Sequence, residues 1–151
     1  LDILKESENF YLRLASQKGI QISYSLEESE DTEMIDRDRI SEVIDNLVSN
    51  AIKYTQPGGE IKIKFSSTIR EVVVQVEDNG QGLSEADLRD IFKSYKKLSA
   101  RPTGGESSTG LGLAIVKKII DMHHGKVWVE SEKNKGAIFS FSIPRIWSQP
   151  Y

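Results

Sequence analysis

The sequence predicts an α+β domain, a two-layer sandwich in which about five strands form a mixed, mostly antiparallel sheet with three main helices on one face. Three long segments carry apolar residues at helical spacing, and five shorter segments read as strands. The clearest strands have only one apolar face, which indicates a sheet covered by helices on one side and open to water on the other. Two strand pairs are separated by short turns, as in antiparallel hairpins.

Composition and charge limit the function classes. A chain of 151 residues is long enough for one domain with a real core. The formal net charge of -3 argues against a nucleic-acid binder that relies on a broad basic surface. The absence of cysteine excludes disulfides and cysteine-ligated metal sites, and it fits a reducing compartment. No apolar run approaches the roughly 20 residues that span a bilayer. The chain opens with neither Met nor a signal peptide, as expected for a fragment of a larger protein.

The first predicted helix covers residues 4–18 and ends at Gly19, because glycine favours the conformation that follows a helix. Its inward-facing residues are expected to be Phe10, Leu14 and Tyr11. A strand, a long helix and two further strands are expected after it, in this order, at 20–26, 38–55, 60–66 and 71–78.

The helix at 38–55 carries two stripes. Apolar residues at positions i, i+3, i+4, i+7, i+8 and i+11 form its core-facing side, namely Ile40, Val43, Ile44, Leu47, Val48 and Ala51. Beside them runs a polar stripe of Glu42, Asn46 and Asn50, continued by Lys53. Asparagine is a poor helix former, so two of them one turn apart are unusual within a helix. The stripe is either a plain polar surface or a wall that meets a metal ion or an anion.

The composition changes after residue 79. Six of the eleven glycines lie between Gly80 and Gly112, and the long loop at 101–109 is of a kind that is usually functional or disordered in a compact domain. The remaining elements are expected to be a helix and two closing strands at 110–123, 126–131 and 137–143.

Two glycine clusters are candidates for ligand binding. The first, AspAsnGlyGlnGly at 78–82, follows a strand, so its carboxylate can accept a hydrogen bond while its glycines let the backbone pass close to a flat ligand. A tight turn explains it equally well. The second, SerSerThrGlyLeuGlyLeu at 107–113, opens a helix and so presents N–H groups and a positive dipole end to phosphate. A flexible loop with a helix cap is the alternative, and the residues match neither a Walker loop nor a dinucleotide fingerprint.

Four motifs in order are more specific than any one of them: AsnLeuValSerAsnAlaIleLysTyrThr at 46–55, the first glycine cluster, IlePheLysSerTyr at 91–95, and the second glycine cluster. Together they resemble the N box, the F box and the paired glycine boxes of the catalytic ATP-binding domain of two-component sensor histidine kinases. This family belongs to the superfamily shared with gyrase, Hsp90 and MutL. The resemblance runs from about Ile3 to Pro144. It implies a Bergerat-type ATP fold, a single domain over 1–151 with an ordered core at about 3–144, and an ATP lid at about 93–109.

The resemblance also implies a Mg-ATP site. Asn50 would ligate Mg²⁺, which suits hard oxygen ligands, and Asn46 would act beside it in catalysis. Asp78 would accept a hydrogen bond from the adenine amino group. The other nucleotide-binding residues would be Lys53, Tyr54, Gly80, Gly82, Lys97, Thr109, Gly110, Leu111 and Gly112.

Three positions depart from the family pattern. Lys97 stands where the family usually has arginine, which puts a bidentate phosphate contact in doubt, although Arg101 could replace it. Lys93 and Ser94 replace the usual acidic–proline pair, and Ala137 stands where a hydroxyl residue is common. Each change could weaken the site, and none removes it.

The implied function is transfer of the ATP γ-phosphate to a histidine on a separate dimerisation domain, which then serves the receiver domain of a response regulator. We expect that phosphoacceptor domain to lie outside this chain, and we expect His123 and His124 to be structural residues at a helix end. The implied location is cytoplasmic, for a parent protein that can be membrane-anchored. No contact of this domain with nucleic acid or membrane is expected.

Two alternatives remain open. An ATP-hydrolysing clamp of the gyrase or Hsp90 type carries a glutamate where Asn46 stands, and an amide cannot take a proton from water. Asn46 therefore favours transfer over hydrolysis. A non-catalytic module that binds a nucleotide or a partner is kept open by Lys97 and Ala137.

Overall fold

The structure is a computed structural model, and it describes residues 1–29, 35–94, 101–104 and 110–145. The helices of these residues are α1 (Asp2–Gln17), α2 (Arg37–Tyr54), α3 (Glu85–Arg89) and α4 (Gly112–Met122). The strands are β1 (Gln21–Leu26), β2 (Glu60–Ser67), β3 (Glu71–Asp78), β4 (Lys126–Ser131) and β5 (Ala137–Pro144). Within the described ranges, no helix is long and apolar enough to cross a bilayer.

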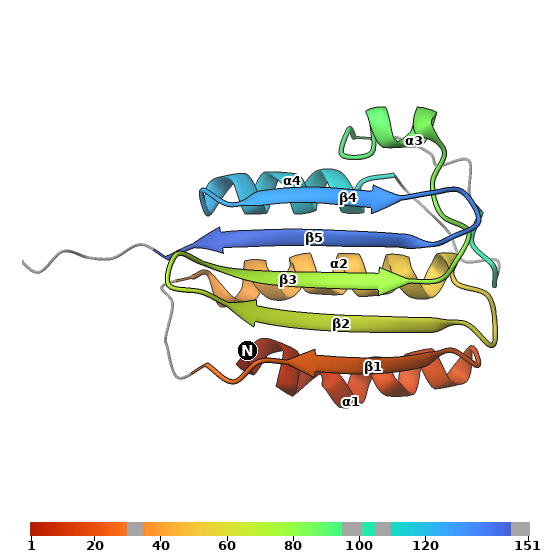
Figure 1. Ribbon diagram of the computed structural model, residues 1–151, viewed down its shortest axis with the longest axis horizontal. Helices are drawn as coiled ribbons and strands as arrows, with labels where there is room; N and C mark the ends of the chain where they lie inside the picture. The colour runs from red at the N-terminus through yellow and green to blue at the C-terminus, as the bar shows by residue number, and fades with distance from the viewer. Residues whose placement is uncertain (30–34, 95–100, 105–109, 146–151) are drawn as a thin grey trace, which may run out of the picture.

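The five strands form one sheet in the order β1-β2-β3-β5-β4 (Figure 1). β1 pairs with β2 in parallel, and every other neighbouring pair is antiparallel. The mixed, mostly antiparallel sheet predicted from the one-sided strands is therefore confirmed. β5, the last described strand in the sequence, lies between β3 and β4, so it is an interior strand of the sheet.

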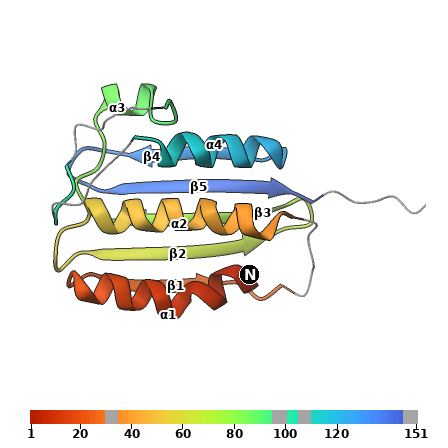
Figure 2. The same ribbon diagram turned by 180° about the vertical axis from the view of Figure 1, so that it is seen from behind.

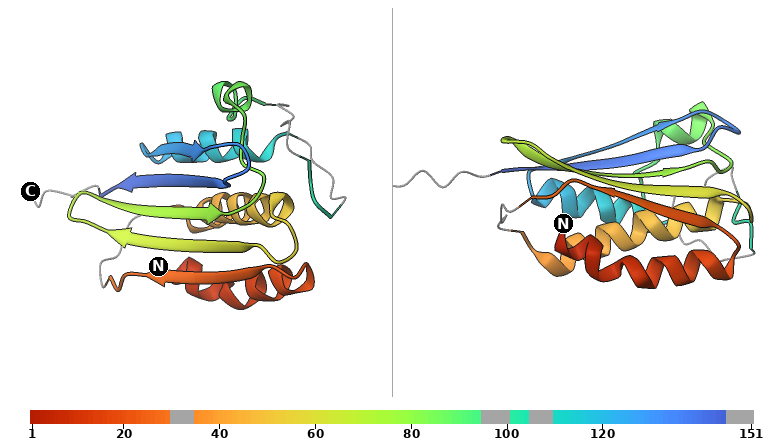
Figure 3. Two further views of the ribbon diagram at one scale, coloured as in Figure 1. Left: turned by 45° about the vertical axis from the view of Figure 1, so that its right-hand side comes forward. Right: turned by 60° about the horizontal axis from the view of Figure 1, so that its bottom comes forward.

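The three long helices cover one face of the sheet, with α2 between α1 and α4 (Figures 2 and 3). This arrangement follows from the strand pattern, because Ile61, Ile63 and Phe65 of β2 are buried while Lys62 is exposed and Lys64 is half-buried. The predicted α+β sandwich with helices on one face is confirmed.

α2 buries all six residues of its predicted apolar stripe, together with Ile52. Its N-terminus is capped by Asp36, whose carboxylate accepts a hydrogen bond of 3.1 Å from the Arg39 amide. At the other end, the Lys18 Nζ donates to the carbonyl oxygens of Ile52 and Lys53, at 2.8 and 3.0 Å. A cation at the carbonyl end of a helix is favourable, so α1 helps to fix the end of α2.

The first helix differs from the prediction in which aromatic residue it buries. Phe10 is 55% exposed, whereas Tyr11 is 2% exposed and its hydroxyl donates to the carboxylate of Asp45 on α2. Leu14 is half-buried against the core, as expected. The sequence favoured Phe10 because it is the more apolar residue, but the hydroxyl of Tyr11 has a partner on α2 that stabilises its burial.

Two further details differ from the sequence prediction. The short helix α3 was not predicted, and it is held by a capping box in which Ser84 and Asp87 bond to each other's backbone amides. The last helix begins at Gly112, two residues after the predicted start. Tyr95, Lys97, Thr109 and most of the predicted lid at 93–109 lie outside the described residues.

Candidate functional site

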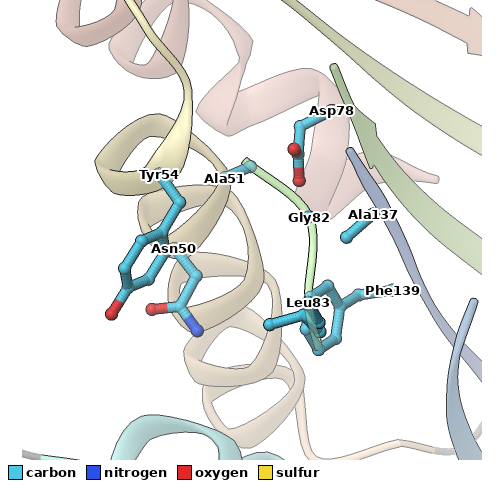
Figure 4. A pocket seen from close by; sticks show the side chains of 8 residues that line it. All are labelled: Asn50, Ala51, Tyr54, Asp78, Gly82, Leu83, Ala137 and Phe139. Carbon is cyan, nitrogen blue, oxygen red and sulfur yellow. The ribbon is translucent and has the colours of Figure 1, made fainter. Parts of the chain in front are cut away.

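A pocket opens between α2, the loop after β3 and the start of β5 (Figure 4). Its wall is largely apolar, with a few polar groups that converge on it, as is typical of small-molecule sites. The residues that line it are Asn50, Ala51, Tyr54, Asp78, Gly82, Leu83, Ala137 and Phe139. Four of them, Asn50, Tyr54, Asp78 and Gly82, were predicted as site residues from the sequence.

Asp78 is the charged group of this pocket. It ends β3 and is only 8% exposed, and its Oδ1 accepts a hydrogen bond of 2.8 Å from the Gly80 amide. Burial raises the pKa of its carboxyl to about 6, although the amides of Gly80 and Ala137 act in the opposite direction. A buried carboxylate facing an apolar pocket can accept a hydrogen bond from an N–H group of a flat ligand.

The loop after Asp78 needs its two glycines because backbone packs closely on both. A Cβ on Gly80 would lie 2.4 Å from the Tyr54 carbonyl oxygen. Gly82 has φ of +66°, and a Cβ there would lie 2.1 Å from the Glu132 carbonyl oxygen. The loop is therefore held between the end of α2 and the turn that joins β4 to β5.

The polar stripe of α2 divides into residues with different contacts. The Asn50 side chain lines the pocket, next to Tyr54 (Figure 4), and among the described residues it makes no hydrogen bond. The Asn46 Nδ2 donates to the Glu42 carbonyl oxygen at 2.8 Å. The Glu42 side chain forms a surface ion pair with Arg39 at 3.0 Å, so it lies outside the site.

The start of α4 lies against the same stripe. A Cβ on Gly112 would be 2.6 Å from the Asn46 Oδ1, so the amide nearly touches the first turn of α4. The N-cap residue of α4 is Leu111, which provides no side-chain cap, and Gly110 before it has φ of +73°. The amides of this turn therefore have no side-chain acceptor within the described part of the chain, which suits an anion.

Lys53 is half-buried at the end of α2, and its ammonium group makes no ion pair with any described residue. Asn50 and Tyr54 line the same pocket as Asp78, whereas Lys53 belongs to the same end of α2 but is not a lining residue. Lys97 and Thr109 belong to the residues that the structure does not describe.

Sequence analysis missed three apolar residues of the pocket. Ala51 was assigned to the core-facing stripe of α2, but it also lines the pocket, together with Leu83 and Phe139. Ala137, which was noted as a departure from the family pattern, is part of the pocket wall, where a hydroxyl group would face the ligand. The alternation in β5 places Phe139 and Ala137 on one face and was the available signal.

The donor set of the site fits a divalent cation held mainly by a ligand. The described ranges contain no group of three or more carboxylate, histidine or cysteine side chains that could hold a metal on their own. One amide oxygen, from Asn50, is free to coordinate. Mg²⁺ commonly keeps water and substrate phosphates as ligands and takes only one or two from protein.

His123 joins two helices rather than entering the pocket. Its Nδ1 lies 2.9 Å from the Ile119 carbonyl oxygen, and its Nε2 accepts from the Asp36 amide at 3.2 Å. The imidazole thereby links the end of α4 to the start of α2.

The family model and the curated relatives that match this chain agree with each other. Residues 35–146 match the family model described as histidine kinase-, DNA gyrase B-, and HSP90-like ATPase. Sensor protein SrrB of Staphylococcus aureus is 39% identical over 110 residues, which are 73% of this chain and 19% of SrrB. The chain thus spans about a fifth of the length of the curated relatives it matches.

Solved structures agree with this match. The catalytic domain of histidine kinase ThkA has a TM-score of 0.82 and 32% identity, over 95% of this chain and 92% of that one. Full-length ShkA in complex with AMPPNP has a TM-score of 0.81 and 27% identity, over 99% and 31%. ThkA in complex with the response regulator protein TrrA has a TM-score of 0.77 and 29% identity, over 96% and 40%.

Proposed function

Because this chain belongs to the histidine kinase-, DNA gyrase B-, and HSP90-like ATPase family, as the ATP-binding domain of a sensor histidine kinase, we propose that it binds Mg-ATP and supplies the γ-phosphate to a histidine. That histidine would lie on a separate dimerisation domain. The single observation that carries the proposal is the nearly buried Asp78 carboxylate in an otherwise largely apolar pocket beside the free amide of Asn50.

The base of the nucleotide would occupy the pocket. Asp78 would accept a hydrogen bond from the exocyclic amino group of adenine, a donor that guanine and the pyrimidine thymine do not present at the same position. Leu83 and Phe139 would give the flat ring apolar contact, and Gly80 and Gly82 would keep side chains out of its plane. The AMPPNP complex of ShkA, a protein with a similar fold, supports the binding of an adenine nucleotide.

The phosphates would extend along α2 toward the start of α4. Asn50 would hold Mg²⁺, which when bound supplies positive charge between the phosphate oxygens. Lys53 would contact a phosphate directly. The amides at Gly110, Leu111 and Gly112 would donate to the phosphate oxygens at the open helix end. We retain Lys97 and Thr109 as proposed nucleotide contacts.

Transfer is favoured over hydrolysis by the groups near the phosphates. Asp78 is the sole carboxylate among the described residues that line the pocket, and it lies at the base end. Asn46 is an amide bonded to the Glu42 carbonyl, so it cannot accept a proton from water. Catalysis would therefore rest on positioning and on stabilisation of the transferring phosphoryl group, with Asn46 fixing the start of α4.

The partners of the whole protein follow from the same proposal. They would be the dimerisation and phosphoacceptor domain of the same kinase and the receiver domain of a response regulator. The complex of ThkA with TrrA supports the second partner, because ThkA contains a domain similar to this chain. We propose that residues 1–151 form a single cytoplasmic domain, and that it contacts neither nucleic acid nor membrane.

A transfer assay tests the function. The chain is mixed with the dimerisation domain of its parent protein, Mg²⁺ and γ-labelled ATP, and the product is tested for an acid-labile phosphohistidine. Transfer with the unaltered chain and none with Asn50→Ala is expected. Release of labelled phosphate without transfer would instead indicate a hydrolysing clamp, and binding without either reaction would indicate a non-catalytic nucleotide module.

A further inference from the structure

Residues 101–104, here called the strap, run along the edge of the molecule where α2 and β3 end (Figure 1, in teal). The side chain of Gln81 is joined to the strap by two hydrogen bonds. Its Nε2 donates to the Arg101 carbonyl oxygen at 2.6 Å, and its Oε1 accepts from the Arg101 amide at 3.2 Å. A primary amide has the same donor and acceptor as a peptide group, so Gln81 pairs with the strap as a neighbouring strand would.

The other end of the strap is fixed to α2. The Thr103 amide donates to the Lys53 carbonyl oxygen at 2.9 Å. The Thr103 hydroxyl lies 2.8 Å from the Thr55 carbonyl oxygen and 3.2 Å from that of Lys53. These carbonyls belong to the end of a helix, where backbone acceptors lack partners within the helix. Thr103 supplies a donor to the Thr55 carbonyl and a further donor to the Lys53 carbonyl, which also accepts from the Lys18 Nζ.

The two attachment points lie on opposite walls of the pocket. Gln81 stands between Gly80 and Gly82 in the loop after β3, whereas Lys53 and Thr55 flank Tyr54 on α2. One further bond joins the walls directly, from the Gln81 amide to the Tyr54 carbonyl oxygen at 3.3 Å. The strap therefore joins the loop after β3 to the end of α2, two segments that each contribute residues to the pocket wall.

We propose that Gln81 and Thr103 are positioning residues for the adenine nucleotide, because through the strap they set the separation of the walls that receive the base. This inference rests on the proposed function. A slot of fixed width lets a flat ring contact both walls without first ordering them, which lowers the entropic cost of binding. We expect the effect on the base to dominate, since Thr103 bonds to the backbone carbonyl of Lys53 and leaves the ammonium group, which is the part assigned to the phosphates, without a bond to the strap.

Two variants test the inference, Gln81→Ala and Thr103→Val. The second keeps the shape of the side chain and removes only the hydroxyl. Calorimetric titrations with Mg-ATP, and NMR titrations with adenosine, which has no phosphates, are expected to show both affinities falling by the same factor, roughly 3- to 10-fold. In the transfer assay KM for ATP should rise by that factor while kcat stays unchanged. Each change weakens one attachment of the same strap, although Thr103→Val keeps the amide bond to the Lys53 carbonyl. The double variant should therefore lose less affinity than the sum of the two single losses.

Matched controls separate this effect from general damage. Gln75→Ala removes a glutamine whose Nε2 donates to the Ser140 hydroxyl at 3.2 Å, away from the pocket, and should leave both affinities unchanged. Thr103→Ser keeps the donor and should behave as the unaltered chain. Thermal melts of all variants are expected to coincide closely.

Three results would overturn the inference. Unchanged affinities in both variants would show that the strap does not position the ligand. A loss confined to ATP, with adenosine binding retained, would assign the strap to the phosphates. Failure of the unaltered chain to bind either ligand would overturn the proposed function and this inference with it, whereas normal binding by the unaltered chain and its variants overturns the inference alone.

Discussion

The Oδ1 atom of Asn46 lies only 2.6 Å from the position that a Cβ on Gly112 would occupy. Real Cβ atoms do not approach an oxygen so closely, so the first residue of α4 has to be glycine if the Asn46 amide is to keep its place. Two motifs separated by more than sixty residues are thus one packed unit. This contact fixes the polar stripe of α2 relative to the N-terminal end of α4.

Substitution of Gly112 by alanine should damage nucleotide binding despite favouring the helix. Alanine is the better helix former by about 1 kcal/mol, but its methyl group would displace the Asn46 amide oxygen from its place beside the start of α4. We expect the affinity for Mg-ATP, measured by calorimetry, to fall at least about tenfold. The double variant Asn46→Ala/Gly112→Ala makes room for the methyl group and should recover part of the binding, though not the transfer. Equal binding by Gly112→Ala would refute the packing argument.

Asn50→Ala should remove binding of Mg-ATP without disturbing the fold. Among the described residues the side chain has no hydrogen bond to lose, so the melting temperature should hold. The affinity for Mg-ATP is expected to fall by about tenfold or more, whereas the affinity for adenosine should not change. Transfer at the unaltered rate in Asn50→Ala would rule out the metal-ligand assignment. Asn50→Asp has the same size and keeps an oxygen ligand, so it should lose less affinity for Mg-ATP than Asn50→Ala.

Asp78→Asn should reduce the preference for adenine. The amide that replaces the carboxylate can present its own N–H groups to the exocyclic amino group, which is also a donor. Competition titrations with ATP and GTP are expected to show the ATP affinity falling more than the GTP affinity. An ATP affinity equal to that of the unaltered chain would show that Asp78 does not contact the nucleotide.

The same residue should give the folded domain a pH signature. The pKa of Asp78 is raised to about 6 in the fold from its ordinary value of 3.8. The folded state therefore binds more protons than the unfolded state between these values, and stability falls as pH rises through that window. The loss reaches up to about 3 kcal/mol. Urea unfolding of the nucleotide-free chain from about pH 4 to about pH 7 should show a steeper loss than in Asp78→Asn, and parallel curves would contradict the assignment.

Tyr11→Phe should affect stability and nothing at the pocket. The ring stays buried between α1 and the core, but the hydrogen bond to Asp45 is lost, and the exposed Asp45 can turn to water. We expect the free energy of unfolding to fall by about 1 kcal/mol. Calorimetric affinity for Mg-ATP should match that of the unaltered chain, and a change in it would mean that α1 contributes to the site.

Much of the fold could be predicted because its signals are local. The strands show one-sided alternation and α2 has an unbroken apolar stripe, so burial in β2 and α2 agrees with the pattern. The local pattern could not predict which of Tyr11 and Phe10 is buried, because the hydrogen-bond partner of Tyr11 is thirty-four residues away. The five-residue helix α3 was missed because it is too short to show a period.

Site residues could be predicted from the sequence where their residue type is unusual for its position in a helix or strand. Asn50 and Asp78 stand out as polar groups where apolar or charged surface residues are expected. Gln81 and Thr103 do not, since a glutamine or a threonine in a loop is ordinary and only the folded chain brings Gln81 beside Arg101. The apolar residues Leu83 and Phe139 were likewise missed, because the sequence cannot distinguish a side chain that faces the core from one that faces a cavity.

The position of β5 inside the sheet, between β3 and β4, links ligand binding to the integrity of the whole domain. The pocket draws on α2, the end of β3 and the start of β5, so it cannot exist unless the last strand has joined the sheet. A ligand that binds only the folded chain at 100 times its Kd adds about 2.7 kcal/mol to the free energy of unfolding. A bound nucleotide would then stabilise the folded state, and the melting temperature of the chain would rise with nucleotide concentration.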